Sequence, residues 1–143
     1  MSQFIKNNYS SYNSIIQLLN LLNEPYYLRN NQIIKQYICY FEKRNEINNL
    51  ITWRNELHQI TLLEICAIKL GSYELTKYLL EHGANPDKVN SNGKTCLDII
   101  YNKQLNNYED IVNLLIDNGA TLNKLENNKT KFSLSKWLMK KLF

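Results

Sequence analysis

The chain has 143 residues, of which 44% are hydrophobic and 21% are charged, and its net charge is +4. This length suits one packed domain and is short for two, so we expect residues 1–143 to form a single domain. No window holds the ~18–20 uninterrupted apolar residues of a membrane span, and residues 1–13 lack the pattern of a signal peptide, which predicts a soluble, intracellular, cytoplasmic protein.

The positive charge is concentrated at the C-terminal end. From Lys124 onward there are six lysines against Glu126 alone, so this tail carries +5 and residues 1–123 together carry −1. Asn, Ile, Lys and Tyr are abundant, while Gly and Pro are scarce. That usage is typical of AT-biased coding and points to an intracellular bacterium, a protist or a large DNA virus.

Two amphipathic stretches open the chain. Their apolar residues recur every three or four positions, which predicts two helices separated by Pro25: Tyr12, Ile15, Ile16, Leu19 and Leu22, then Ile34, Tyr37, Ile38 and Phe41. We assign residues 9–52 to an N-terminal helical cap or a degenerate repeat. Residues 46–60 then form a long connecting loop.

The next part of the chain repeats one pattern twice. Residues 61–87 read TLLEICAIKLGSYELTKYLLEHGANPD, and residues 95–123 read TCLDIIYNKQLNNYEDIVNLLIDNGATLN. Each copy predicts a helix, a turn and a second helix, ended by Gly83 or Gly119 in the left-handed conformation that glycine adopts without steric cost. Repetition at such a period indicates stacked structural units, which we assign to residues 53–123.

Both copies open with the spacing of a capping box. In Thr61-x-x-Glu64 and Thr95-x-x-Asp98 the hydroxyl can accept a hydrogen bond one turn on, while the carboxylate reaches back to the cap amide. We interpret Glu64 and Asp98 as caps rather than as a catalytic carboxylate pair, with Asp98 the weaker of the two.

These units resemble ankyrin repeats, which have a Thr-initiated inner helix, an outer helix ending in Leu-Leu-x-x-Gly-Ala, as at residues 79–84, and a projecting hairpin-like loop. The resemblance implies an all-α, short ankyrin-type helical solenoid with N- and C-terminal capping helices. The family's Thr-Pro-Leu-His opening is Thr-Leu-Leu-Glu at residues 61–64 and Thr-Cys-Leu-Asp at residues 95–98. The copies also exceed the family's length by about one and about three residues, so we expect an enlarged turn at residues 102–107.

The tail is expected to close the stack. Two repeats are too few for a stable solenoid, and residues 124–143 place Leu134, Trp137, Leu138 and Leu142 on one helical face, which predicts a C-terminal capping helix. The same helix is basic and amphipathic. An acidic membrane surface, a nucleic acid or a docking partner, contacted through Lys136, Lys140 and Lys141, stays open as an alternative.

The sequence shows no pattern typical of catalysis. Cys39, Cys66 and Cys96 lie among apolar residues and are expected to be buried thiols. His82 falls at the end of an outer helix, where a solvated or charge-compensating role fits best. Without a nucleophile elbow, a phosphate-binding loop or a metal-ligand cluster, we expect no enzyme, no cofactor, no metal and no small-molecule substrate.

The resemblance implies that hairpin tips and inner helices form a concave surface that binds another protein. Trp53 could anchor such an interface or fold back over the gap between the cap and the first repeat. The polar positions could equally be a solvated edge. The candidate contact residues are Trp53, Arg54, Glu56, His58, Ile68, Lys69, Ser91, Asn92, Lys94, Asn102 and Lys103.

The expected function is therefore a non-enzymatic protein–protein interaction module. We expect a stoichiometric inhibitor or modulator, in the manner of a viral or bacterial protein that acts on a host factor in the host cytoplasm or nucleus. The alternative is an adaptor, or a protein that associates with membrane or nucleic acid through its basic C-terminal helix. Binding to phosphate groups would weaken steeply with salt, whereas an apolar contact would not.

Overall fold

The computed structural model describes residues 11–103 and 107–121. The predicted C-terminal capping helix, residues 124–143, lies outside this range, as do residues 9 and 10 of the predicted N-terminal cap. The elements in chain order are α2 (Ser11–Asn23), the 3-10 turn η1 (Tyr26–Leu28), α3 (Asn31–Lys43), β1 (Ile51–Thr52), β2 (Gln59–Ile60), α4 (Leu62–Glu64), the π-helix η2 (Ile65–Lys69), α5 (Tyr73–Glu81), α6 (Cys96–Lys103) and α7 (Glu109–Asp117).

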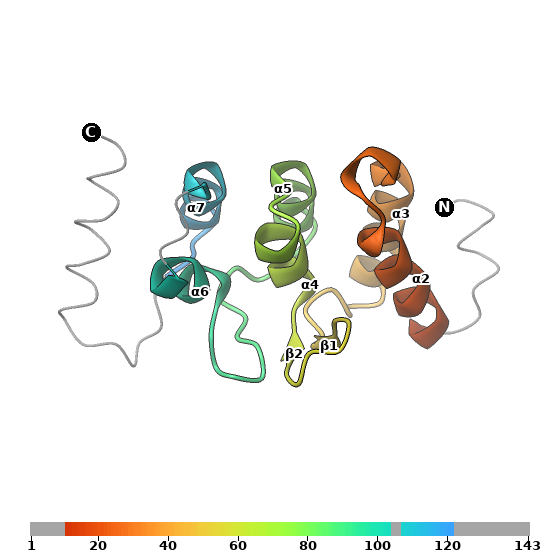
Figure 1. Ribbon diagram of the computed structural model, residues 1–143, viewed down its shortest axis with the longest axis horizontal. Coiled ribbons are helices and arrows are strands. Elements are labelled where there is room, and N and C mark those ends of the chain that lie inside the picture. The colour runs from red at the N-terminus through yellow and green to blue at the C-terminus, as the bar shows by residue number, and fades with distance from the viewer. Residues whose placement is uncertain (1–10, 104–106, 122–143) are drawn as a thin grey trace.

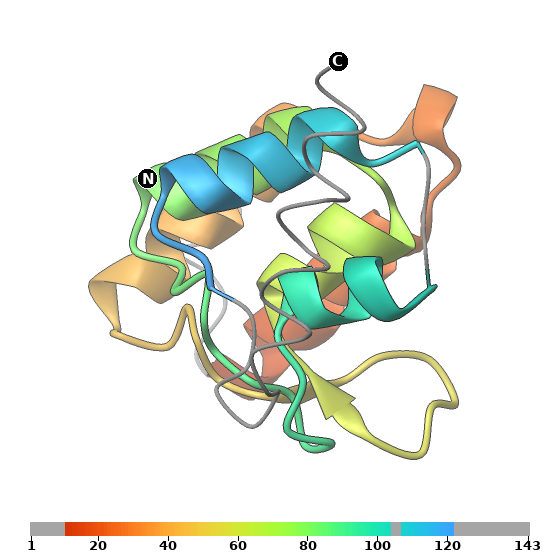
Figure 2. The same cartoon turned by 90° about the vertical axis from the view of Figure 1, so that its left-hand side faces the viewer.

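The helices stand in two parallel rows. An outer row holds α3, α5 and α7, and an inner row holds α2, α4 with η2, and α6 (Figure 1). Seen along the stack, the members of each row overlap (Figure 2). Each inner helix packs against the outer helix that follows it, and α5 packs against both α3 and α7. The helical solenoid predicted from the repeats is therefore what the chain forms.

One continuous hydrophobic core lies between the rows. Each helix is amphipathic and turns its apolar side to its neighbours, and each fully buried aliphatic side chain stabilises the fold by roughly 1.5–3 kcal/mol. The fully buried aliphatic residues include Leu18, Leu22, Ile34, Ile38, Ile65, Leu75, Leu79, Leu97 and Leu115. The core thus runs from α2 to α7 without interruption.

The two capping boxes differ from each other. Thr95 and Asp98 form a reciprocal pair, in which the Thr95 amide donates to Asp98 Oδ2 at 3.0 Å and the Asp98 amide donates to Thr95 Oγ1 at 3.2 Å. Thr61 Oγ1 accepts from the Glu64 amide at 3.0 Å, but the Glu64 carboxylate accepts from the side chain of Asn90. The prediction that Glu64 completes the stronger box is wrong, because its carboxylate accepts a hydrogen bond from the Asn90 carboxamide and not from the cap amide.

The inner helix of the first repeat widens into a π-helix. The Leu70 amide donates to the carbonyl of Ile65 at 2.9 Å, five residues back, and the Ser72 amide donates to Cys66 at 2.8 Å. A π turn holds one residue more than an α turn, so this stretch accommodates the extra residue of the first copy. In the second copy Asn102 and Lys103 are still helical, so the predicted turn cannot begin there, and residues 104–106 lie outside the described range.

The predicted connecting loop contains a small antiparallel hairpin. Ile51 pairs with Ile60 and Thr52 with Gln59, which leaves residues 53–58 as the hairpin loop. Trp53 is only 1% exposed and belongs to the hydrophobic core. Of the two positions left open for Trp53, the surface anchor is wrong, and the side chain instead folds back into the core. The guanidinium of Arg54 covers the Trp53 ring at 4.9 Å, and its Nε donates to Asn23 Oδ1 at 2.9 Å, which fastens the hairpin to the end of α2.

The two caps give the first prediction. Thr95→Ala removes the acceptor of the Asp98 amide, and Thr61→Ala removes that of Glu64, so each should lower the free energy of unfolding by ~0.5–2 kcal/mol. Denaturant unfolding followed by circular dichroism measures both. Thr52→Ala, at an exposed strand position, is the control and should stay within ~0.5 kcal/mol of the parent. An unchanged midpoint in Thr95→Ala would contradict the cap.

Candidate functional site

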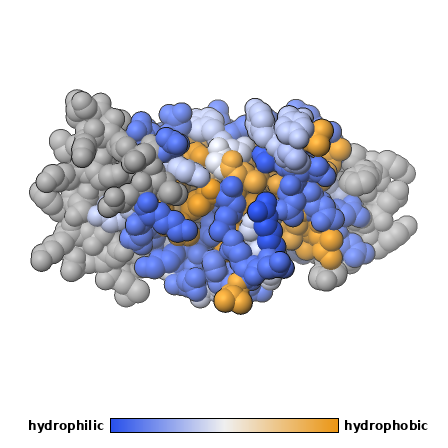
Figure 3. Space-filling model, viewed as in Figure 1, coloured by the Kyte–Doolittle hydropathy of each residue, from blue (hydrophilic) through white to orange (hydrophobic). Residues whose placement is uncertain are grey.

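A hollow of about 240 Å³ lies where the loops meet the inner row. We call it the groove. It brings together seven of the eleven predicted contact residues: His58, Ile68, Lys69, Asn92, Lys94, Asn102 and Lys103. Its other lining residues, Glu64, Asn90 and Ile99, were not among the predicted contacts. The face shown in Figure 3 is mostly hydrophilic over the loops, in keeping with this polar lining.

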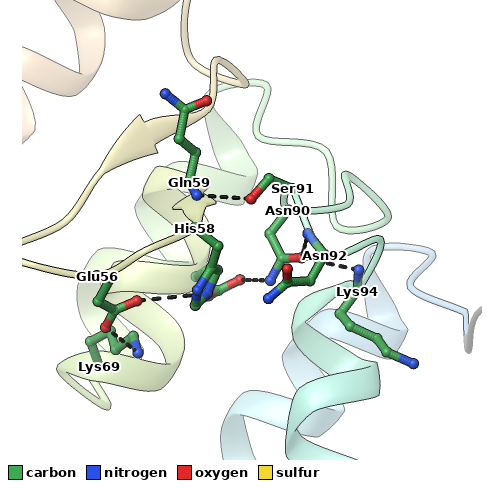
Figure 4. A network of polar contacts seen from close by, with 9 residues as sticks. Glu56, His58, Gln59, Lys69, Asn90, Ser91, Asn92 and Lys94 are labelled. Atoms are coloured by element: carbon green, nitrogen blue, oxygen red, sulfur yellow. Dashed lines mark hydrogen bonds and ion pairs between the residues drawn. The ribbon is translucent and has the colours of Figure 1, made fainter.

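Asn90 connects the groove to the inner row (Figure 4). Its side chain is 4% exposed and donates from Nδ2 to Glu64 Oε1 at 2.9 Å. Its Oδ1 accepts from the amides of Asn92 at 2.9 Å and of Lys94 at 3.1 Å. Asn90 thereby folds residues 88–95, which we call the Asn90 loop, and ties them to α4.

The Asn90 loop is also bonded to the hairpin. The Ser91 amide donates to the carbonyl of Gln59 at 3.0 Å, and Ser91 Oγ accepts from the Gln59 amide at 2.9 Å. Ser91 therefore acts as a link between the two loops, and it does not line the groove. Because backbone and side-chain bonds hold both loops, the surface is formed before any partner arrives.

The rim of the groove is rich in cations. Lys69 Nζ lies 2.7 Å from Glu56 Oε1, and His58 Nε2 lies 3.6 Å from Glu56 Oε2. Glu56, which was predicted to contact a partner, thus orients its neighbours beside the groove. Within residues 11–103 and 107–121, no acidic group lies at ion-pair distance from Lys94 or Lys103. Among the described residues, these two ammonium groups are therefore not neutralised by an ion pair.

Glu64 is a buried carboxyl group at the base of the groove. It is 3% exposed, and burial raises its pKa above the ordinary value. The hydrogen bond from Asn90 and the nearby Lys69 and His58 lower that pKa in part without cancelling the effect of burial. The neutral form is therefore favoured more than in an exposed glutamate.

Two predicted contacts, Trp53 and Arg54, lie away from the groove, and a third, Ile68, lines it in a different way from that expected. Trp53 lies in the core, and Arg54 leaves the groove to pack on Trp53 and Asn23. Ile68 is 9% exposed and forms part of the floor instead of an accessible edge. The sequence reasoning missed Leu57, which is fully exposed in the hairpin loop. Recognising Ile51–Ile60 as a hairpin would have placed this leucine at a projecting tip.

A second and larger hollow, of about 450 Å³, lies between α3 and α5, and no predicted contact residue lines it. Cys39 Sγ lies there, 3.0 Å from Tyr78 Oη, and this contact, with partial burial, raises the pKa of Tyr78 to about 12. Cys39 is only half-buried, which corrects its prediction as a buried thiol. Cys66 and Cys96 are buried as predicted, and burial raises the pKa of both thiols.

His82 makes a contact that the sequence did not indicate. Its Nδ1 lies 3.0 Å from Glu42 Oε2, so it joins the outer helices α5 and α3 at their ends. In the part of the chain that the structure describes, no group of His, Cys, Asp and Glu residues could hold a metal ion. No helix there is long and apolar enough to cross a membrane.

The family model described as "Ankyrin repeats (3 copies)" matches residues 26–126. The chain belongs to the ankyrin-repeat family. The all-α, ankyrin-type fold predicted from the two repeats is thereby confirmed. Ankyrin repeats generally mediate protein–protein interaction and are typically non-catalytic modules. The match begins at Tyr26, inside the region 9–52 for which the sequence left a cap or a degenerate repeat open.

This ankyrin-repeat protein is similar to a much larger one. It is 31% identical over 101 residues to the E3 ubiquitin-protein ligase hecd-1 of Caenorhabditis elegans. The aligned part covers 71% of this chain but 3% of hecd-1, so the chain spans a small fraction of that relative. No solved structure matches the chain.

Glu64 gives a pH-dependent prediction. Because its pKa is raised in the folded state, its contribution to stability is fully present below about pH 4.5 and falls as the pH rises through the folded-state pKa. Glu64→Gln keeps an acceptor for Asn90 and has no charge to bury. The variant should therefore gain in unfolding free energy relative to the parent as the pH rises.

Glu74→Gln is the matched control. Hydrogen bonds from Lys35 and Asn31 lower the pKa of Glu74, so its contribution is present above about pH 4.5 and lost as the pH falls. Its variant should lose stability relative to the parent as the pH rises. Urea unfolding between about pH 4 and pH 7 measures both. Parallel curves for Glu64→Gln and the parent would contradict the assignment.

Proposed function

We propose that this ankyrin-repeat protein binds another protein in the groove and at the hairpin tip, and acts as a stoichiometric modulator by covering part of the partner's surface. The observation that carries the proposal is the preformed groove, whose loops are held to each other and to α4 by Asn90 and Ser91. A surface ordered in advance loses little conformational entropy on association, which favours binding.

Leu57 supports a protein partner. Its side chain is fully exposed in the hairpin loop, between Glu56 and His58, whose side chains lie 3.6 Å apart. Hydrophobic atoms protrude at the lower edge of the molecule in Figure 3, beneath β1 and β2. Protein interfaces commonly have an apolar centre surrounded by a polar rim, and Leu57 among its polar neighbours fits that arrangement.

The abundance of Asn, Ile, Lys and Tyr supports a more specific proposal about the origin and target of the chain. A chain from an AT-biased viral or bacterial genome would act on a host factor, in the host cytoplasm or nucleus. The alternative is an adaptor, or a protein that reaches nucleic acid or an acidic membrane through the tail. The +5 charge of residues 124–143 favours that alternative. Binding through the tail would be lost at high salt and indifferent to changes in the groove.

The test is affinity purification from the cells in which the protein acts, with washes at low and high salt. The parent is compared with Asn102→Trp, which fills the groove, and with Lys77→Trp, a control on the outer helix α5. We expect a protein that survives high salt, is lost with Asn102→Trp and is kept with Lys77→Trp. The change in the captured partner's activity should reach a plateau once one equivalent of this chain has been added.

Two results would contradict the proposal. One is capture that does not change with Asn102→Trp. The other is capture of nucleic acid or lipid alone, released by salt, which would move the function to the tail.

Leu57 gives a separate prediction. Leu57→Asp should weaken binding of that partner by more than ~1 kcal/mol, because it replaces an apolar anchor by a charge. The unfolding free energy should change by less than ~0.5 kcal/mol, because the side chain touches no core. Calorimetric titration and denaturant unfolding measure the two quantities. Val89→Asp is the control at another exposed apolar position. Equal losses of binding affinity in both variants would contradict a specific role for Leu57.

A further inference from the structure

We propose that the groove recognises an acidic segment of its partner, whose carboxylates pair with Lys94 and Lys103 while one apolar side chain rests on Ile68 and Ile99. This inference rests on the proposed function and specifies the chemistry of the partner. It concerns one occupant, a peptide segment of a protein with carboxylates beside an apolar residue.

The charge of the groove differs from that of the chain around it. Residues 1–123 carry −1 in total, yet Lys69, Lys94, Lys103 and His58 all line this one hollow. Glu56 engages Lys69 and His58, and the Glu64 carboxyl group is buried and accepts a hydrogen bond from Asn90. Lys94 and Lys103 are therefore left to set the sign of the potential that a partner meets, and that sign is positive.

The apolar floor and the small size of the groove fit one side chain of a partner protein. Ile68 and Ile99 provide an apolar floor between the polar rims. The volume of about 240 Å³ is below the ~300–1,000 Å³ of ordinary small-molecule pockets. The carboxamides of Asn92 and Asn102, both exposed at the edge, can donate to and accept from a peptide backbone.

A nucleic acid fits these residues less well. Single strands are held by several cations along the backbone together with aromatic side chains on which bases stack. Among the described residues that line the groove, His58 has the only aromatic ring, and it faces Glu56. The groove therefore matches carboxylates of a protein segment better than a run of phosphates.

The experiment is a selection from a random peptide display library on the purified full chain. Peptides selected by the parent should be enriched in Asp and Glu next to an aliphatic or aromatic residue. Lys94→Glu with Lys103→Glu should bind these peptides at least about tenfold more weakly, because two attractive pairs become repulsive. In its own selection this double variant should prefer Lys and Arg. Lys77→Glu with Lys88→Glu, two exposed lysines that do not line the groove, should bind the parent's peptides normally.

The outcomes separate this inference from the proposed function. Peptides that Asn102→Trp blocks but that show no acidic enrichment would overturn the inference and leave the groove a binding site. An absence of any peptide that depends on the groove would contradict both. Tighter binding of a single-stranded oligonucleotide, lost with the Lys94 and Lys103 double variant, would also overturn the inference.

Discussion

The groove depends on the buried carboxamide of Asn90. Its amide group donates to Glu64, and its oxygen accepts from the amides of Asn92 and Lys94. A buried polar group left without its partner costs about 1–3 kcal/mol, and loss of this side chain would affect three groups at once. The Asn90 loop would then be attached to the hairpin through Ser91 but no longer to α4. The Asn90 side chain, together with the hydrogen bond from its backbone amide to the carbonyl of Lys94, thus sets the position of Lys94 relative to Ile68 and Lys69.

The inner row supplies the other half of the groove through its π-helical stretch. In a regular α-helix each residue turns by about 100°, so one additional residue would rotate everything after it. The wider turn of Ile65–Lys69 takes up that residue and keeps Ile68 and Lys69 toward the loops. Trp53 contributes through the hairpin, because its burial holds the base of the hairpin and leaves Leu57 and His58 in the loop.

The sequence could predict those structural features that depend on residues close to one another in the chain. Helical spacing identified the helix pairs, and Gly83 and Gly119 both have φ of +94°, as the helix-ending pattern requires. The features that it could not predict depend on distant partners. Glu64 and Asn90 are 26 residues apart, and nothing local shows that a carboxamide would take the carboxylate from the cap. Strands of two residues carry too little alternation to reveal a hairpin, so the position of Trp53 stayed open between a surface anchor and a folded-back residue, and Leu57 went unnoticed. The capping role of residues 124–143 stays a prediction.

Amide hydrogen exchange in the parent and in Asn90→Ala is the most direct test of a preformed groove held by this residue. We expect the amides of Asn92 and Lys94 to exchange at least about tenfold faster in the variant, while the amide of Ala84, bonded to Leu79 in the outer row, keeps its protection. Unchanged exchange at Asn92 and Lys94 would contradict the account, because the loop would then hold its shape without Asn90.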